Sequence, residues 1–291
     1  MHVRGGGDRG LFVSAAALSI GLTYANDTGG NWIIFVVGAL AIMLYSLEKG
    51  CDVMAGVFWA VVAIKPQDGF LLAIPLLLAK KWKTIFVAGG ICLLATWIAS
   101  VFIGKPMVEL ILEVPKIKSG SQVANLLPQF VYEWIVARGV AESVVQYGCM
   151  LTGLALCVAL SLAVRQYKDW RVKIVPAILC ASLWTYMAPY DRCIFFVVQI
   201  VFAREFLQSQ SVKERIFLAV GMIAIFCSGL ETILQCSALL PRIGEILSMP
   251  CFAKFVENTV IIVYGLGVFL STIVIIAWCI LKKRSAYFYV K

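Results

Sequence analysis

Residues Ala55 to Lys83, AGVFWAVVAIKPQDGFLLAIPLLLAKKWK, decide the fold of this chain. The run holds two apolar arms separated by Lys65-Pro66-Gln67-Asp68-Gly69, and a basic group closes it. An arm of about 12 residues makes roughly 18 Å of helix, whereas the hydrocarbon core of a bilayer is about 30 Å thick. The run therefore predicts a hairpin that enters a membrane without crossing it and carries a lysine and an aspartate at its tip.

The composition of the whole chain is that of a membrane protein. Hydrophobic residues make up 62% of its 291 residues, charged residues only 14%, and the mean hydropathy is +0.92. These values predict an all-α, polytopic membrane protein, with about ten membrane-embedded helices in a single domain over residues 1–291. The net charge of +9 does not indicate nucleic-acid binding, because the lysines and arginines fall in small groups between apolar segments.

The cysteines and the single histidine limit the chemistry. Most of the ten cysteines lie inside apolar runs and none forms a CxxC pair, so we expect buried, apolar cysteines. Cys236 and Cys251 flank one loop and could form a disulfide if that side is oxidising. The only histidine is His2, which argues against histidine metal sites and histidine-dependent triads. We expect no cofactor.

The apolar runs define the predicted membrane-embedded segments. They cover residues 11–25, 32–47, the arms 53–64 and 69–79, 84–103, 144–164, the arms 174–187 and 193–203, 216–235 and 259–281. Residues 104–143 form a loop of mixed polarity, in which 126–136 predict an amphipathic helix lying in the membrane interface.

Alternation of sides along these segments brings the basic stretches together. Residues 1–10, 48–52, 80–83, 165–173, 204–215 and 282–291 fall on one face, and all except the near-neutral 48–52 turn are basic, which predicts the cytoplasmic face. The other face holds 26–31, the first tip at 65–68, the loop 104–143, the second tip at 188–192, and 236–257. Both hairpins then point outward, and their tips could share one cavity on the extracytoplasmic side.

The charges of the two tips are the candidate site. Lys65 and Asp68 lie in the first tip, Asp191 and Arg192 in the second, and Asp27 lies in an outer turn. Charges at membrane depth are costly unless they face water, a partner charge or a charged ligand. Each tip could form an internal ion pair that merely solvates a turn. Alternatively, the cations hold an anionic ligand while a carboxylate takes a proton from an attacking hydroxyl.

The quoted run resembles the signature segment of glycosyltransferase family 87, the polyprenol-phosphate-mannose-dependent mannosyltransferases of type-C fold. The likeness lies in an Ala-Gly-rich helix, the tripeptide Lys65-Pro66-Gln67, an apolar helix and a basic Lys-Trp ending. Gly30-Asn31 before an apolar span and Pro189-Tyr190-Asp191 resemble two further features of the family. Together they cover roughly residues 30–205 in the family's order.

The resemblance implies transfer of a sugar, typically mannose, from a polyprenol-phosphate donor to a glycolipid or glycan acceptor. The reaction would take place on the extracytoplasmic face of a membrane that we expect to be a bacterial plasma membrane. The residues that would contact the donor phosphate are Lys65, Gln67, Tyr190 and, on charge alone, Arg192. The candidates for the catalytic base are Asp191, Asp68 and Asp27.

One departure from the family leaves the function open. Family members carry their catalytic aspartate on a long outer loop ahead of the Gly-Asn span, and only about thirty residues precede Asn31 here. We expect either that the start of the protein has been lost or mis-assigned, or that the protein never had that base. The alternatives are an active hexosyltransferase, a catalytically incomplete relative or a partner that binds lipid-linked sugar in polysaccharide assembly, and a transporter. Hairpins of shared orientation and the lack of an internal repeat argue against the transporter. The sugar and the acceptor are not fixed by the sequence.

Overall fold

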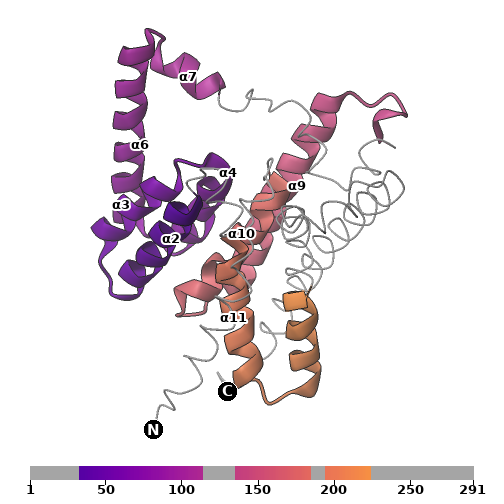
Figure 1. The fold of residues 1–291 in the computed structure, drawn as a ribbon. Coiled ribbons are helices and arrows are strands. Elements are labelled where there is room, and N and C mark those ends of the chain that lie inside the picture. The colour runs from indigo at the N-terminus through magenta and orange to yellow at the C-terminus, as the bar shows by residue number, and fades with distance from the viewer. Residues whose placement is uncertain (1–32, 114–134, 185–193, 224–291) are drawn as a thin grey trace, which may run out of the picture.

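The structure is a computed structural model that describes residues 33–113, 135–184 and 194–223 (Figure 1). These three segments are built from helices and short connections and contain no strand, which confirms the all-α prediction for the described part of the chain. The elements are α2 (Ile33–Glu48), α3 (Asp52–Val62), α4 (Pro66–Gly69), the 3-10 turn η1 (Phe70–Leu72), α5 (Ala73–Leu78), α6 (Trp82–Ile103), α7 (Met107–Glu113), α9 (Glu142–Val164), α10 (Trp170–Trp184) and α11 (Phe195–Gln208). A further helix covers 212–223.

The first predicted hairpin is present, with a more broken second arm than the sequence suggested. The first arm is the continuous helix α3, whereas the second arm consists of α4, η1 and α5 in succession. Pro75 explains the interruption at η1, because proline lacks the backbone N–H group that would bond to the carbonyl of Leu71 in a continuous helix. Neither arm is long enough to span a bilayer as a straight helix.

The second predicted hairpin is described only in its two arms. Helix α10 begins at Trp170, four residues before the predicted start at Ile174, and the cause is Asp169. The Asp169 carboxylate accepts a hydrogen bond of 2.9 Å from the backbone N–H of Arg171, which is the capping arrangement that starts a helix. Helix α11 extends to Gln208, past the predicted end at Ala203.

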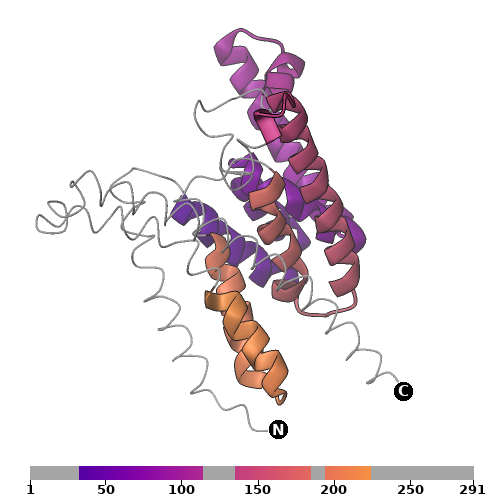
Figure 2. The same cartoon turned by 90° about the vertical axis from the view of Figure 1, so that its right-hand side faces the viewer.

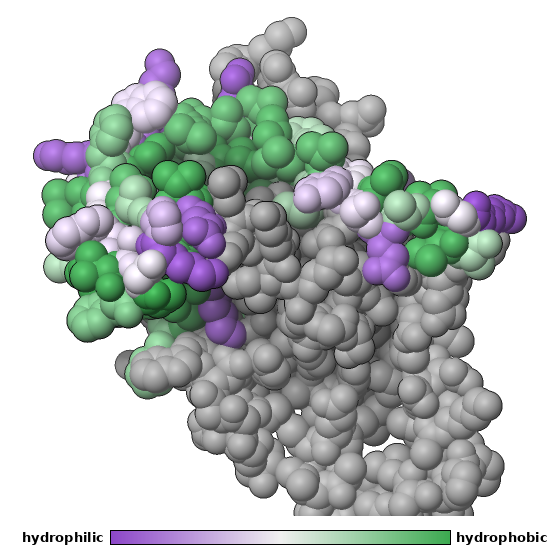
Figure 3. Space-filling model, turned by 90° about the horizontal axis from the view of Figure 1, so that it is seen from above, coloured by the Kyte–Doolittle hydropathy of each residue, from purple (hydrophilic) through white to green (hydrophobic). Residues whose placement is uncertain are grey.

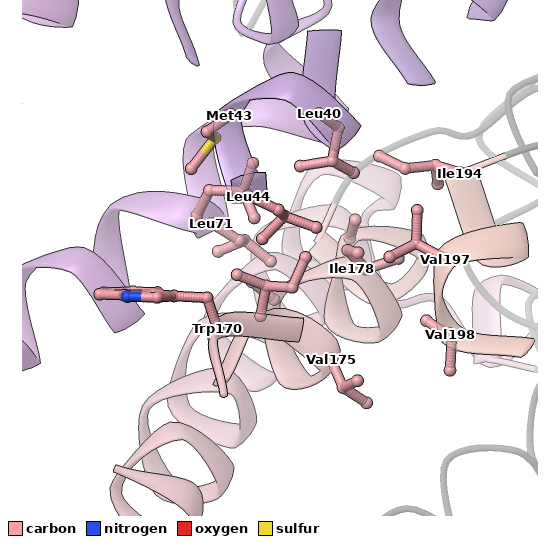
Figure 4. Close-up of a cluster of buried hydrophobic side chains, with 14 of the residues drawn as sticks. Leu40, Met43, Leu44, Leu71, Trp170, Val175, Ile178, Ile194, Val197 and Val198 are labelled. Atoms are coloured by element: carbon pink, nitrogen blue, oxygen red, sulfur yellow. The ribbon is translucent and has the colours of Figure 1, made fainter. Parts of the chain in front are cut away.

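Helix α10 lies at the centre of the described part of the chain. It contacts α9, α11, α2, α4, η1 and α5, and most of its side chains up to Ala181 are buried. Figure 4 shows Ile178 of α10 in one cluster with Leu44 of α2, Leu71 of η1 and Val197 of α11. A helix that is apolar on all sides is buried by its neighbours, so α10 fixes the position of the first hairpin relative to the rest.

Helices α6 and α9, of 22 and 23 residues, are each long and apolar enough to cross a membrane. Thr84 and Ala88 are the buried residues of α6, whereas Phe86 is 74% and Phe102 87% exposed. Figures 1 and 2 place α6 at the edge of the described helices. Figure 3, viewed from above, shows hydrophobic residues over much of the described surface. So large an exposed apolar surface is typical of a helix that faces lipid rather than water.

The loop predicted over 104–143 contains one helix that the sequence did not predict. Helix α7 follows Pro106, and Gly104 ends α6 in the left-handed conformation with a φ of 72°. The predicted interfacial helix 126–136 lies almost entirely outside the described residues. The same holds for the segments 11–25 and 259–281, while 216–235 is described only as far as 223.

Candidate functional site

The first hairpin is held to α6 by a close contact of backbones. Gly56 of α3 is buried against α6, and a Cβ added at Gly56 would lie 2.8 Å from the carbonyl oxygen of Thr84 and 2.7 Å from the Cβ of Val87. Only glycine allows the two helices to approach this closely. The glycine of the Ala55-Gly56 pair, part of the family-like signature, therefore serves helix packing in this chain.

The tip of the hairpin is fixed by a second close contact and by one long-range hydrogen bond. Trp59 is buried in α3, and its indole N–H donates a 3.0 Å hydrogen bond to the carbonyl oxygen of Gly69. A Cβ added at Gly69 would lie only 2.6 Å from the Cα of Ala63, so α4 packs directly on the end of α3. The turn between the arms is thus held tightly in place.

Lys65 lies where the two arms meet. It occupies the residue just before α4, in an extended conformation with φ −100° and ψ 95°, and Pro66 follows in the first turn, where proline is favoured. The Lys65 carbonyl accepts a 3.0 Å hydrogen bond from the backbone N–H of Gly69. The side chain of Lys65 is half-buried. The hairpin therefore holds the backbone of this lysine in one position.

The other candidate residues are only partly located. Gln67 and Asp68 lie in α4, but their side chains are outside the described part, so an ion pair between Asp68 and Lys65 stays a prediction. Tyr190, Asp191, Arg192 and Asp27 also lie outside the described residues.

The structure brings the first tip against the hairpin that carries the second. Helix α4, which carries Gln67 and Asp68, contacts α10, and so do η1 and α5. The second tip follows directly after α10 in the sequence, between Trp184 and the start of α11. A shared cavity requires the first tip to contact α10, and it does. That the two tips meet stays a prediction.

At the opposite end of the hairpin, four of the predicted basic-face segments meet through ion pairs. Arg171 contacts Glu48 at 3.3 Å and Asp169 at 3.0 Å, and Asp169 also pairs with Arg204. These contacts confirm that 48–52, 165–173 and 204 lie together; we call this the basic end. The sequence predicted only an orientation from these cations, and the acidic residues that lie between them were not predicted.

A second ion pair brings the fourth segment, 80–83, to the basic end. Lys81 Nζ lies 2.7 Å from Asp52 Oδ1, and the Thr84 hydroxyl donates a 3.1 Å hydrogen bond to the Asp52 carbonyl. These contacts join the start of α3 to the start of α6. The first hairpin is therefore braced at both of its ends.

The carboxylate of Asp169 is stabilised in its charged form. Burial alone would raise the pKa of Asp169, but the hydrogen bonds and charge of Arg171, together with Arg204, outweigh burial and hold this pKa below its usual value. Asp169 lies in the connection between α9 and α10, outside the long apolar helices. The Asp169 carboxylate forms ion pairs with Arg171 and Arg204 at the basic end, and its lowered pKa makes it a weak base.

The cysteines of the described residues form no metal site. Cys157 and Cys180 are buried, and Cys92 and Cys149 are half-buried, broadly as the sequence predicted, whereas Cys51 is exposed. No group of three or more metal-ligating side chains occurs within the described ranges. The proposed disulfide partners Cys236 and Cys251 lie outside them.

Comparisons of the chain with protein-family models, with curated proteins and with solved structures found no match. Membership of glycosyltransferase family 87 therefore stays a prediction from the quoted motifs.

Proposed function

We propose that this chain is a membrane glycosyltransferase of type-C fold that moves a sugar, most simply mannose, from a polyprenol-phosphate donor to an acceptor on the extracytoplasmic face. The observation that carries the proposal is the braced first hairpin. Its arms are too short to cross a bilayer, and its tip is held by the hydrogen bond from Trp59 to Gly69. A lysine at such a tip suits the phosphate of a lipid-linked donor, because a charge at membrane depth needs a partner charge or a charged ligand.

The chemistry needs one fixed cation and one carboxylate. The acceptor oxygen attacks the anomeric carbon of the sugar, the bond from that carbon to the phosphate oxygen breaks, and polyprenol phosphate leaves. Lys65 stabilises the negative charge that develops on the departing phosphate, and Arg192 and Tyr190 add contacts from the second tip. Asp191, Asp68 or Asp27 takes the proton of the acceptor hydroxyl. Contact of α4 with α10 supports the presence of both tips at one site.

The proposal is tested in membranes that contain the full-length chain. Transfer of labelled mannose from a polyprenol-phosphate-mannose donor is expected to fall at least 100-fold in Lys65→Ala and in Asp191→Ala, in line with the loss of one charge-stabilising group or of the general base. Lys83→Ala is the matched control, because Lys83 is an exposed lysine at the basic end, and it should keep full activity.

The outcomes separate the remaining alternatives. Full activity in both site variants, at equal expression, contradicts the proposal. Donor binding that depends on Lys65 without any turnover by the wild-type chain would instead identify a partner that binds lipid-linked sugar.

A further inference from the structure

Two lysines at the basic end lie close to one buried indole ring. Lys173 Nζ lies 4.6 Å from the centre of the Trp170 ring, and Lys81 Nζ lies 6.0 Å from the same centre. Trp170 is 5% exposed, and both lysine side chains are half-buried. The indole holds both ammonium groups by cation–π attraction and fixes where they lie.

The charges at this position do not balance. Asp52 neutralises Lys81 at 2.7 Å, but within the described part of the chain no carboxylate lies within ion-pair distance of Lys173. Burial, and next the positive charge of Lys81, lower the pKa of Lys173, which lies in the first turn of α10 ahead of the apolar stretch. Two neighbouring cations, of which only Lys81 is paired with a carboxylate in the described part of the chain, favour the binding of an anion.

The site lies at the height of lipid headgroups if α6 spans the bilayer. Lys81 immediately precedes α6, whose first residue is Trp82, and Trp82 is 51% exposed. Tryptophan and lysine at the end of an apolar helix are typical of the membrane–water interface. Lys80 beside it is exposed and adds positive charge to the approach.

We propose that Lys81, Lys173 and Trp170 form a binding site for the phosphate group of an anionic phospholipid at the basic end. The phosphate oxygens accept charge-assisted hydrogen bonds from the Lys173 ammonium and from the Lys81 protons that Asp52 does not use. Basic pockets between membrane helices bind anionic headgroups in this way. The site is distinct from the site proposed for sugar transfer, because Lys65 lies at the other end of the first hairpin.

The test measures lipid binding to the full-length chain in detergent by native mass spectrometry, with phosphatidylglycerol as the probe. Lys173→Gln should raise the dissociation constant about tenfold, the amount expected from the loss of one half-buried charge-assisted hydrogen bond. Lys173→Arg, which keeps the charge, and Lys83→Gln, an exposed lysine on the same face, should each stay within about threefold of the wild type. Phosphatidylcholine, whose headgroup has no net charge, should bind at least about tenfold more weakly to the wild type.

A second measurement needs no variant and so does not depend on the folding of one. In the wild-type chain, phosphatidylglycerol should protect Lys173 from acetylation more strongly than Lys83, and phosphatidylcholine should protect neither. Equal lipid affinity of Lys173→Gln and Lys83→Gln, or equal protection of the two lysines, overturns the proposal. Inorganic phosphate that protects Lys173 while phosphatidylglycerol does not overturns the lipid as the source of the phosphate.

Discussion

Adding one methyl group at Gly69 should release the tip of the first hairpin. In Gly69→Ala the new Cβ would lie 2.6 Å from the Cα of Ala63 and 2.9 Å from its backbone nitrogen, whereas ordinary contact begins at 3.4 Å. To restore a contact of 3.4 Å from 2.6 Å, the backbones of Gly69 and Ala63 must move apart by 0.8 Å. Side-chain rotation cannot supply this movement, because the closest atoms belong to the backbone of Ala63. The φ of Gly69 is −95°, so the expected effect is purely one of space.

The magnitude follows from two contributions. Overpacking of this kind costs about 1–3 kcal/mol. A shift of that size along the hydrogen bond from Trp59, which is 3.0 Å long, would break the bond and leave a buried indole N–H unsatisfied, at about 1–3 kcal/mol. Because the two contributions overlap, we expect Gly69→Ala to lower the free energy of unfolding by about 2–4 kcal/mol.

The assay is a titration of the full-length protein from mild detergent into dodecyl sulfate, with helix content followed by circular dichroism. Gly90→Ala is the matched control, because no atom lies within 4 Å of a Cβ added at Gly90 in α6. That variant should be unchanged or up to about 1 kcal/mol more stable, since alanine favours a helix interior. Trp59→Phe combined with Gly69→Ala should be less than additive, because both remove the same hydrogen bond. A Gly69→Ala protein as stable as Gly90→Ala would show that the close contact at Gly69 does not hold the tip.

Two further predictions concern the basic end. Lys80 has a φ of 56° in the turn that ends α5, and this left-handed conformation is unfavourable for residues with a Cβ. Lys80→Gly should therefore stabilise the chain by up to about 1 kcal/mol in the same titration. Lys83→Gly, inside α6, should instead destabilise it, and the reverse order would contradict the left-handed conformation of Lys80. The lowered pKa of Asp169 predicts stability that is fully present above the usual aspartate pKa of about 3.9 and is lost as the pH falls through the folded pKa. Asp169→Asn should therefore be less stable than the wild type at pH 7, with the gap closing below about pH 4; a gap that does not depend on pH would show that the Asp169 charge contributes nothing.

The outline of the described helices could be predicted, because it depends on where apolar runs begin and end. The arm 53–64 became α3 at Asp52–Val62, and the predicted span 84–103 became α6 at Trp82–Ile103. Proline explains why the second arm was less regular than its hydropathy suggested. The early start of α10 was missed because the carboxylate of Asp169, a single side chain inside a basic loop, caps the helix.

The contacts that position the candidate site could not be predicted, because they join residues from different helices. Nothing in the spacing of Gly56 shows that it faces Thr84, and nothing in the spacing of Trp59 shows that it reaches Gly69. The same pattern of residues suits either catalysis or packing. Here the glycine and tryptophan of the family-like run serve packing, and they hold the backbone of Lys65 in place at the tip.

Helix α10 keeps the two proposed phosphate sites apart. Its first turn holds Trp170 and Lys173 at the basic end, and its last residue, Trp184, leads to the second tip. A helix of 15 residues is about 22 Å long, so one phosphate cannot occupy both sites. Because α10 also contacts α4, η1 and α5, a change that tilts it would move the first tip and the basic end together.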